Sequence, residues 1–343
     1  MSSLPRHKKN RSTSTPKGLH PRNIHNQDYD FPSLVKSYPR LAPHVNINVY
    51  GNLSIDFADP LAVKFLNAAL LKHHYNIIDW DIPEGALCPP IPGRVDYIHH
   101  IAQLLGCDEL TTNQATNQHT LQANLQSAPR SSMTLLDIGT GANGIYTLLA
   151  SKIYGWHCVG SDINTQSLEN VAAIIAQNST LKDYITLRRQ QDKNHIFDGI
   201  IQAGEYFDVS VCNPPFHASL DDALKSNQRK FNNLAQNRAE PSATDTNQNE
   251  VAHKSTSPSP TLNFGGLGGE LWCSGGERLF LKKLIKESQQ FSSQCRWFTS
   301  LISKIDNVKP AKKWLNKLGA TEVREIEMAQ RNKITRILAW TFH

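Results

Sequence analysis

The sequence lacks any apolar run that approaches the roughly 20 residues needed to cross a membrane. Its N-terminus is basic, but no apolar segment follows it, so we expect neither a membrane span nor a secretory signal. The six cysteines include no C-x-x-C pair, and several of them lie inside apolar runs. This pattern argues against a disulfide framework and a zinc site, and it predicts free thiols in a reducing compartment, the cytoplasm.

Acidic residues are also missing from the start of the chain, where none precedes Asp28. The same stretch carries the basic residues Arg6, Lys8, Lys9, Arg11, Lys17 and Arg22. Such an arm can neutralise phosphates, and the formal net charge of +6 adds a mild bias towards polyanionic partners. A solvated tail explains the arm equally well. Because few apolar anchors occur there, we predict that residues 1–25 form a disordered basic tail.

Helical patterns begin after this tail. Asp59 suits a helix N-cap and Pro60 the first helical position, and apolar residues follow at helical spacing. A proline-rich extended stretch, 82–93, then delivers Arg94 to the start of a second helix, which is predicted over 95–105.

Two histidine pairs invite a metal interpretation, His73 with His74 and His99 with His100. Adjacent residues on a helix point about 100° apart, so neither pair chelates an ion naturally. We interpret these histidines as surface or helix-packing residues and predict no metal site.

A change in composition marks the start of a second region. Residues 111–132 are rich in Thr, Asn, Gln and Ser and predict a linker, and a short buried strand is predicted over 133–138. A G-x-G-x-x-G pattern follows and opens a helix, as in nucleotide-cofactor folds. Asp137 directly precedes the glycines Gly139 and Gly141. Its charge suits the cationic ammonium and sulfonium of S-adenosylmethionine better than an anionic pyrophosphate.

Further polar residues follow the next two strands. Asp162 stands at the tip of the second strand, where it can accept hydrogen bonds from both ribose hydroxyls, and Ile163 is positioned to lie against the adenine. Gln191 and Asp192 follow a third strand, predicted over 184–188. Since open α/β sheets bind ligands outside the carboxyl ends of their strands, we expect these residues to share one edge of the sheet.

A fourth strand, predicted over 207–212, ends abruptly in Asn-Pro-Pro-Phe. Two consecutive prolines have no N–H group, so the strand must stop and Asn213 is held at its tip. The Asn213 side-chain carbonyl and a backbone carbonyl near Pro214 can hold both hydrogens of an exocyclic amine, with Phe216 stacked on the ring. The alternative is an ordinary turn that ends a strand.

The remaining chain completes an α/β pattern. Residues 224–261 are polar, with few large apolar side chains, and predict a disordered insertion. The elements predicted beyond it are a helix over 278–290, a strand over 295–302, a helix over 309–318, and an antiparallel hairpin of strands 321–328 and 333–342. The predicted fold is a Rossmann-like seven-stranded sheet with helices on both faces, plus a helical N-terminal extension.

These motifs resemble the class I S-adenosylmethionine-dependent amino methyltransferases, and several segments are similar to one family among them. The segments are Phe57-Ala58-Asp59-Pro60, Pro92-Gly93-Arg94-Val95-Asp96-Tyr97-Ile98-His99, Leu136-Asp137-Ile138-Gly139-Thr140-Gly141, Cys212-Asn213-Pro214-Pro215-Phe216-His217 and Gly265-Gly266 with Glu270-Leu271 and Gly275-Gly276-Glu277. They resemble the ribosomal RNA large subunit methyltransferase F family, which is related to the eukaryotic methyltransferase-like 16 RNA enzymes. The resemblance implies methylation at N6 of an adenine in 23S ribosomal RNA, at the family position adenine 1618.

The resemblance also implies a role for each candidate residue. The implied cofactor-binding residues are Arg94, Asp137, Gly139, Gly141, Asp162, Ile163, Asp192 and Asn213, and the implied catalytic residues are Asn213, Pro214 and Phe216. Arg94 would pair with the methionine carboxylate of S-adenosylmethionine, although a structural salt bridge is an alternative. Asn213, Pro214 and Phe216 would hold the flipped target adenine.

The leading hypothesis is a cytoplasmic, monomeric RNA adenine-N6 methyltransferase that acts on 23S ribosomal RNA or a large-subunit assembly intermediate. One rival is a protein-glutamine N5 methyltransferase, against which the basic arm favours RNA. Another is a noncatalytic RNA-binding ribosome-assembly factor, which would not need Asn213. The predicted organisation is a tail over 1–25, a helical segment over 26–110 that contributes to the cofactor and RNA site, a linker over 111–132, and a methyltransferase domain over 133–343 with the insertion 224–261.

Overall fold

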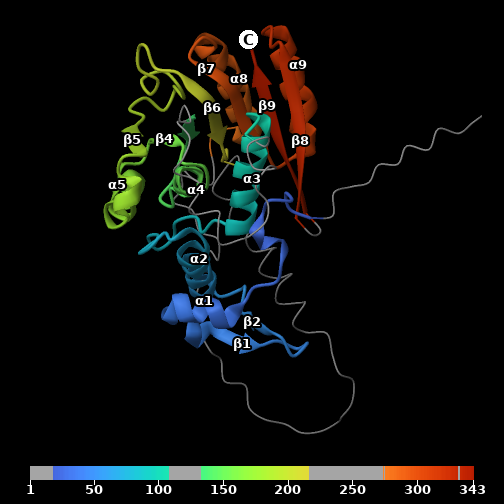
Figure 1. The fold of residues 1–343 in the computed structure, drawn as a ribbon. Helices are drawn as coiled ribbons and strands as arrows, with labels where there is room; N and C mark the ends of the chain where they lie inside the picture. Colours follow the sequence, from blue (N-terminus) through green and yellow to red (C-terminus); the bar gives the residue numbers. More distant parts are fainter. Residues whose placement is uncertain (1–17, 108–132, 216–272, 274, 331–332) are drawn as a thin grey trace, which may run out of the picture.

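The computed structural model describes residues 18–107, 133–215, 273, 275–330 and 333–343, and its centre is a seven-stranded mixed sheet (Figure 1). In spatial order the strands are β5 (Ile185–Arg189), β4 (His157–Asp162), β3 (Thr134–Ile138), β6 (Phe207–Cys212), β7 (Cys295–Ile302), β9 (Lys333–Thr341) and β8 (Glu322–Gln330). The strands from β5 to β7 run parallel, and β9 and β8 close the sheet as an antiparallel hairpin. The predicted fold class and the closing hairpin are confirmed.

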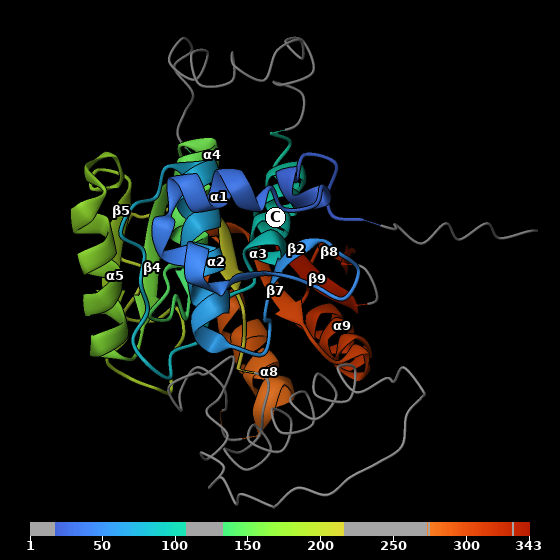
Figure 2. The same ribbon diagram turned by 90° about the horizontal axis from the view of Figure 1, so that it is seen from below.

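Helices cover both faces of the sheet (Figures 1 and 2). One face carries α3 (Ile91–Leu104), α4 (Ile145–Tyr154) and α5 (Thr165–Gln177), and the other carries α8 (Gly276–Ser288) and α9 (Val308–Lys317). Successive strand residues point to opposite faces, so Leu135 packs with the first group of helices and Leu136 with the second. Burial on both faces explains why these strands are nearly continuous apolar runs rather than alternating ones.

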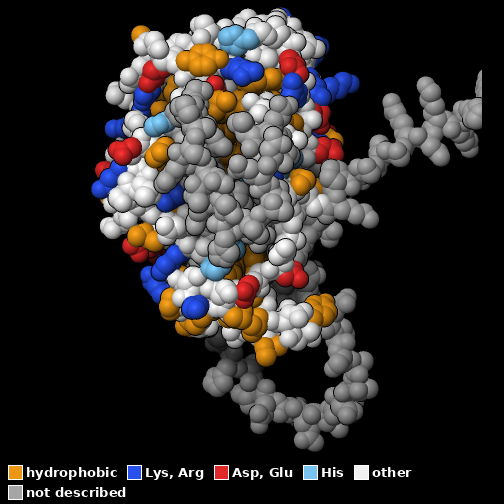
Figure 3. Space-filling model, viewed as in Figure 1, with side chains coloured by type: hydrophobic (Ala, Val, Ile, Leu, Met, Phe, Trp, Pro, Cys, Tyr) orange, Lys and Arg blue, Asp and Glu red, His pale blue; other side chains and the backbone are white. Residues whose placement is uncertain are grey.

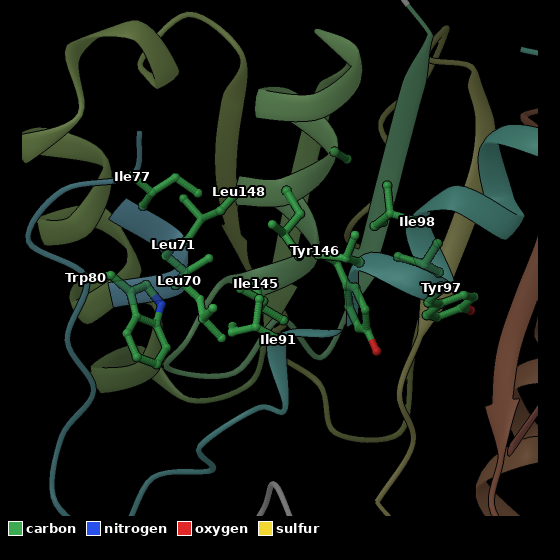
Figure 4. Packing of buried hydrophobic residues seen from close by; sticks show 14 of the residues in the cluster. Leu70, Leu71, Ile77, Trp80, Ile91, Tyr97, Ile98, Ile145, Tyr146 and Leu148 are labelled. Carbon is green, nitrogen blue, oxygen red and sulfur yellow. The ribbon is translucent and has the colours of Figure 1, made fainter. Parts of the chain in front are cut away.

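The N-terminal segment packs on the same side of the sheet as α3 and α4. It contains α1 (Phe31–Ser37), the antiparallel pair β1 (Val45–Ile47) and β2 (Leu53–Ile55), and α2 (Pro60–Tyr75). The Asp59 carboxylate accepts a hydrogen bond from Leu61 N at 2.9 Å, which confirms the predicted N-cap of α2. Leu70 of α2 and Leu148 of α4 share one buried cluster (Figure 4). The segment therefore extends the core of the sheet domain.

Ordered structure begins earlier in the chain than predicted. We expected residues 1–25 to form a disordered tail, but residues 18–25 have a defined conformation against α3. The buried Asp96 carboxylate accepts hydrogen bonds from His20 N at 2.6 Å and from Asn23 Nδ2 at 3.2 Å. The prediction counted apolar anchors, whereas polar contacts to a buried acid hold this segment.

The start of α3 also differs from the prediction. We expected an extended stretch to residue 93 and a helix over 95–105, but α3 begins at Ile91 and includes Pro92 in its first turn. The first N–H groups of a helix have no acceptor within the helix, so a proline there loses no hydrogen bond. Arg94 therefore lies inside the first turn of α3, where the helix fixes the direction of its side chain.

The segment between α2 and α3 is fastened to the loop that follows β3. Trp80 Nε1 donates a hydrogen bond to the Asn143 carbonyl at 3.0 Å. The Asn170 side-chain amide of α5 donates to the carbonyls of Asp81, at 2.9 Å, and Ala142, at 2.7 Å. The N-terminal segment therefore borders the glycine-rich loop and presents Arg94 beside it.

Several predicted features lie outside the described residues: residues 1–17 of the tail, the linker 111–132, the insertion 224–261 and Phe216. Among the helices that the structure describes, none is both long enough and apolar enough to cross a membrane.

Candidate active site

The carboxyl ends of three neighbouring strands lie at one level of the sheet. Ile138, the last residue of β3, is in register with Ser161 of β4 on one side and with Cys212 of β6 on the other. The glycine-rich loop, Asp162 and Asn213 follow these positions directly. The parallel register thus brings together three of the polar features that were predicted from separate parts of the sequence.

The glycine-rich loop is held against β4 by hydrogen bonds. Gly139 N donates to Ser161 O at 2.9 Å, and Gly141 N donates to the Asp162 carboxylate at 2.9 Å. Gly139 and Gly141 have φ angles of 71° and 62°, in the left-handed region that other residues rarely adopt. Burial raises the pKa of Asp162. Its role towards the ribose stays a prediction, and its hold on the loop is a second role that the sequence did not reveal.

Asp137 is a buried acid with one polar neighbour, the Thr140 hydroxyl, which lowers the pKa of its carboxyl without forming a well-aligned hydrogen bond. Its side chain is only 1% exposed, and neither carboxylate oxygen accepts a hydrogen bond from a described residue. Burial raises the pKa of Asp137 to about 7. An unpaired charge in this position is unfavourable, so the site favours a cationic group that would compensate it.

Arg94 of α3 contacts Tyr146, an aromatic residue at the start of α4. Its Nη1 donates a hydrogen bond to Tyr146 Oη at 2.7 Å, and its guanidinium carbon lies 5.5 Å from the centre of the Tyr146 ring. The charge of Arg94 also lowers the pKa of the Asp137 carboxyl, against the larger effect of burial. The structure thus provides one negative and one positive group near the loop.

Asn213 directly follows β6 and presents a buried acceptor that no described residue pairs with. Its Oδ1 atom is buried, and no described residue donates a hydrogen bond to it. Pro214 is buried behind it. The turn therefore holds the Asn213 carbonyl without satisfying it, which is the arrangement expected of a group that meets a ligand donor.

The loops after β4 and β5 are joined through Gln190. Gln190 N donates to Asp162 O at 2.9 Å, its side-chain oxygen accepts from Asp192 N at 2.9 Å, and its side-chain amide donates to Asp198 O at 2.8 Å. Ile163 stands on the neighbouring loop with half of its side chain exposed. An exposed apolar side chain beside an ordered polar loop suits a flat heteroaromatic group, so the adenine-side roles of Ile163 and Asp192 stay predictions that the arrangement supports.

Comparison with known proteins identifies the family. A family model described as RNA methyltransferase matches residues 13–343. The ribosomal RNA large subunit methyltransferase F of Saccharophagus degradans is 56% identical over 95% of this chain and 95% of its own length. This chain belongs to the ribosomal RNA large subunit methyltransferase F family. The F-family protein of Shewanella oneidensis is 54% identical, over 95% of this chain and 82% of its own.

Solved structures show the fold of this methyltransferase F family member. The hMettl16 catalytic domain in complex with a MAT2A 3′UTR hairpin is 28% identical, with a TM-score of 0.72, and the match covers 95% of this chain and 96% of that one. The N-terminal domain of human METTL16 in complex with SAH is 26% identical, with a TM-score of 0.68, over 95% and 100% of the two chains. The predicted class I methyltransferase fold is confirmed.

The F family is S-adenosylmethionine-dependent, and the described residues fit this cofactor. The methionine end carries an ammonium, a sulfonium and a carboxylate. The unpaired Asp137 carboxylate matches the two cations, and the Arg94 guanidinium matches the anion. The tight turn of the glycine-rich loop leaves its backbone open to close approach, since Gly139 carries no side chain.

Two residues that contact the candidate site residues were not predicted from the sequence. Tyr146 is the second residue of α4, and an aromatic residue in a helix is usually a core residue, so nothing in the pattern distinguished it. Gln190 was adjacent to the predicted Gln191 and Asp192, but only the fold shows that it is buried and organises the loop. Both residues contact parts of the chain that are distant in sequence, and the spacing of residues in the sequence does not predict such contacts.

Proposed function

We propose that this chain transfers the methyl group of S-adenosylmethionine to the N6 amino group of one adenine in 23S ribosomal RNA, at the family position adenine 1618. The observation that carries the proposal is the buried Asn213 Oδ1, to which no described residue donates a hydrogen bond. Leaving a buried acceptor unsatisfied costs about 1–3 kcal/mol. An exocyclic amine of a flipped base supplies the missing donor.

The residues of the chain would act by binding and orientation. S-adenosylmethionine supplies an electrophilic methyl group when it is bound. Asn213 Oδ1 and the backbone carbonyl near Pro214 would each accept one hydrogen of the amine, which turns the nitrogen lone pair out of the base plane. Asp137 would hold the cationic part of the cofactor and Arg94 its carboxylate. No covalent bond to the enzyme is required.

Support for RNA as the substrate comes from the relatives, whose names specify ribosomal RNA, and from the hairpin bound to hMettl16. A basic surface patch does not carry this argument. On the face drawn in Figure 3, the visible Lys and Arg side chains of the described residues are interspersed with acidic ones. Arg22 of the basic arm donates to His99 O at 3.2 Å and lies over the Tyr154 ring, so it contributes to packing.

The proposal extends to the form of the substrate and of the enzyme. We propose a monomer that acts in the cytoplasm on 23S ribosomal RNA or on a large-subunit assembly intermediate. Deproteinised 23S RNA and assembling particles, offered in parallel, distinguish the two substrates by which of them is methylated faster.

The decisive test is methyl transfer from labelled S-adenosylmethionine to deproteinised 23S RNA, with the modified nucleoside read by mass spectrometry. Wild type should yield N6-methyladenosine. Asn213→Ala should lower the rate about 100-fold or more, because the amine is no longer oriented, while the variant still binds S-adenosylhomocysteine. Asn46→Ala, which changes an exposed asparagine of β1, is the matched control and should retain the wild-type rate.

Three results would overturn parts of this proposal. Label in glutamine of a ribosomal or release-factor protein, with none in RNA, would establish the protein-glutamine reaction instead. Cofactor and RNA binding without methylation of either substrate form would indicate a noncatalytic assembly factor. Full activity of Asn213→Ala would remove the role assigned to the turn.

A further inference from the structure

Arg94 has a long side chain, and an ordered partner keeps it in one position. The residue lies in the first turn of α3, half-buried, and its Nη1 donates to Tyr146 Oη at 2.7 Å. The guanidinium also lies over the Tyr146 ring, 5.5 Å from its centre. Tyr146 thus contacts Arg94 both through its hydroxyl and through its ring face.

Tyr146 is itself fixed by its surroundings. It is 4% exposed and follows the glycine-rich loop at the start of α4. Its ring meets the Tyr97 ring edge-to-face at 5.2 Å, and Figure 4 shows the two rings on neighbouring helices. Tyr97 Oη lies 2.7 Å from Thr299 Oγ1, which donates to Ser210 O of β6 at 2.8 Å. A chain of packed and hydrogen-bonded side chains therefore connects Tyr146 with β6, the strand that Asn213 follows.

We propose that Tyr146 is a positioning residue that holds the Arg94 guanidinium for the cofactor carboxylate, and that this pair makes the site selective for adenosyl ligands that carry a carboxylate. The inference rests on the proposed function in one respect, the assignment of Arg94 to that carboxylate. Burial raises the pKa of Tyr146 to about 12, so its oxygen remains a neutral hydroxyl that accepts from Arg94 at physiological pH.

Tyr154 offers a matched control on the same helix. Its hydroxyl lies 2.7 Å from His99 Nδ1, and the guanidinium carbon of Arg22 lies 5.6 Å from the centre of its ring. Both tyrosines therefore have a hydrogen-bonded hydroxyl and an arginine over the ring. Tyr146 contacts Arg94 whereas Tyr154 contacts Arg22, so Tyr146→Phe is the change expected to affect recognition of the carboxylate.

The test measures binding by calorimetry rather than activity. The probes are S-adenosylhomocysteine and its decarboxylated counterpart, and the proteins are wild type, Arg94→Gln, Tyr146→Phe and Tyr154→Phe. Wild type should bind the ligand with the carboxylate about 10- to 100-fold more tightly, and Arg94→Gln should lose this preference. Tyr146→Phe should reduce the preference about fivefold through the ligand with the carboxylate alone. Tyr154→Phe should keep it.

The outcomes separate this inference from the proposed function. If Arg94→Gln keeps the wild-type preference, the assignment of the carboxylate to Arg94 fails, and the inference fails with it. If Arg94→Gln loses the preference but Tyr146→Phe keeps it, only the role of Tyr146 is overturned. An equal loss of affinity for both ligands in Tyr146→Phe would show a merely structural role. Thermal unfolding of each ligand-free variant establishes that the compared proteins are folded.

Discussion

Two regions of the molecule bury carboxylates in opposite ways. In α8, Glu287 is 7% exposed, and its oxygens accept hydrogen bonds from the backbone N–H groups of Ile196, Phe197 and Asp198 at 2.8 to 3.0 Å. At the end of β3, Asp137 is 1% exposed and accepts none from the described residues. Backbone N–H groups satisfy the first acid, whereas the second has no well-formed hydrogen bond from the described residues, as we expect of a group that binds a cationic ligand.

Burial alone therefore does not separate structural acids from functional ones. Glu277 follows the pattern of Glu287, because it accepts hydrogen bonds from Lys304 N at 3.2 Å and Asn307 Nδ2 at 2.6 Å. Asn213 follows the pattern of Asp137, because its buried carbonyl oxygen has no donor among the described residues. Asp137 and Asn213 therefore differ from Glu287 and Glu277 in the number of donors at their buried oxygens.

The largest change in the free energy of unfolding is expected from replacing Glu287, the acid whose oxygens are satisfied by backbone N–H groups. Glu287→Ala leaves three backbone N–H groups without their acceptor and should lower the free energy of unfolding by about 3 to 5 kcal/mol. Urea unfolding monitored by circular dichroism measures this. Glu169→Ala, which changes an exposed acid of α5, is the control and should stay within about 0.5 kcal/mol of wild type. A loss below about 1 kcal/mol in Glu287→Ala would contradict the structural role.

Replacing Asp137 should change the free energy of unfolding in the opposite direction. Asp137→Asn removes a buried charge whose desolvation outweighs the favourable effects of Thr140 and Arg94, so the free energy of unfolding of the ligand-free protein should rise at pH 8, by about 1 to 3 kcal/mol. The same change should weaken binding of S-adenosylhomocysteine about tenfold or more, because the ammonium loses its counter-charge. Urea unfolding with and without the ligand tests both effects. If Asp137→Asn destabilises the ligand-free protein as Glu287→Ala does, the contrast between the two acids is wrong.

The pKa of Asp137 adds a pH dependence with a defined sign. The folded value of about 7 lies above the ordinary value of 3.8, so the native state keeps its proton longer than the unfolded state. The destabilisation therefore grows as pH rises from 3.8 to about 7 and is constant above that. Affinity for S-adenosylhomocysteine should rise about tenfold from pH 6 to pH 7.5 as the carboxylate ionises. Asp137→Asn should bind with a flat profile, and parallel profiles would exclude Asp137 as the titrating group.

Local signals in the sequence predict most of the sheet. Apolar runs that end in polar turns predict the parallel strands, because strands buried on both faces need continuous apolar residues. Glycines and paired prolines mark where the chain must turn, and this located Gly139, Gly141 and Asn213. The common level of these residues then follows from parallel pairing, which the repeated strand–helix pattern predicts.

Contacts between distant segments account for what the sequence did not predict. Glu287 binds residues about 90 positions earlier in the chain, and Tyr146 binds Arg94 52 positions earlier. No periodicity or local motif reports such a pair. Residues 18–25 are held in the same way by Asp96, a buried acid of α3 that lies 76 positions after His20.

The smallest effect concerns histidines of the N-terminal segment, which are buried in the neutral form. Burial lowers the pKa of His25 and His99 to about 3 and that of His74 to about 4. The unfolded chain protonates these groups near pH 6.5, so their contribution to stability is complete above pH 6.5 and is lost as pH falls towards 4 for His74 and towards 3 for His25 and His99. His99→Gln should therefore lose less free energy of unfolding between pH 7 and pH 5 than wild type loses.

On acidification Asp137 raises the free energy of unfolding, whereas the buried histidines lower it, so the two effects partly cancel in wild type. Because Asp137 is present in both histidine variants, a comparison between them isolates the contribution of His99. Urea unfolding at the two pH values should give a smaller difference for His99→Gln than for His157→Gln, which changes an exposed histidine of β4. Equal differences would mean that folding does not lower the pKa of His99, although its ring pairs with the Tyr154 hydroxyl. A smaller difference for His99→Gln would show that the fold stabilises the neutral form of this base. The pH dependence of the free energy of unfolding then identifies, for buried acids and bases alike, which protonation state the surrounding residues satisfy.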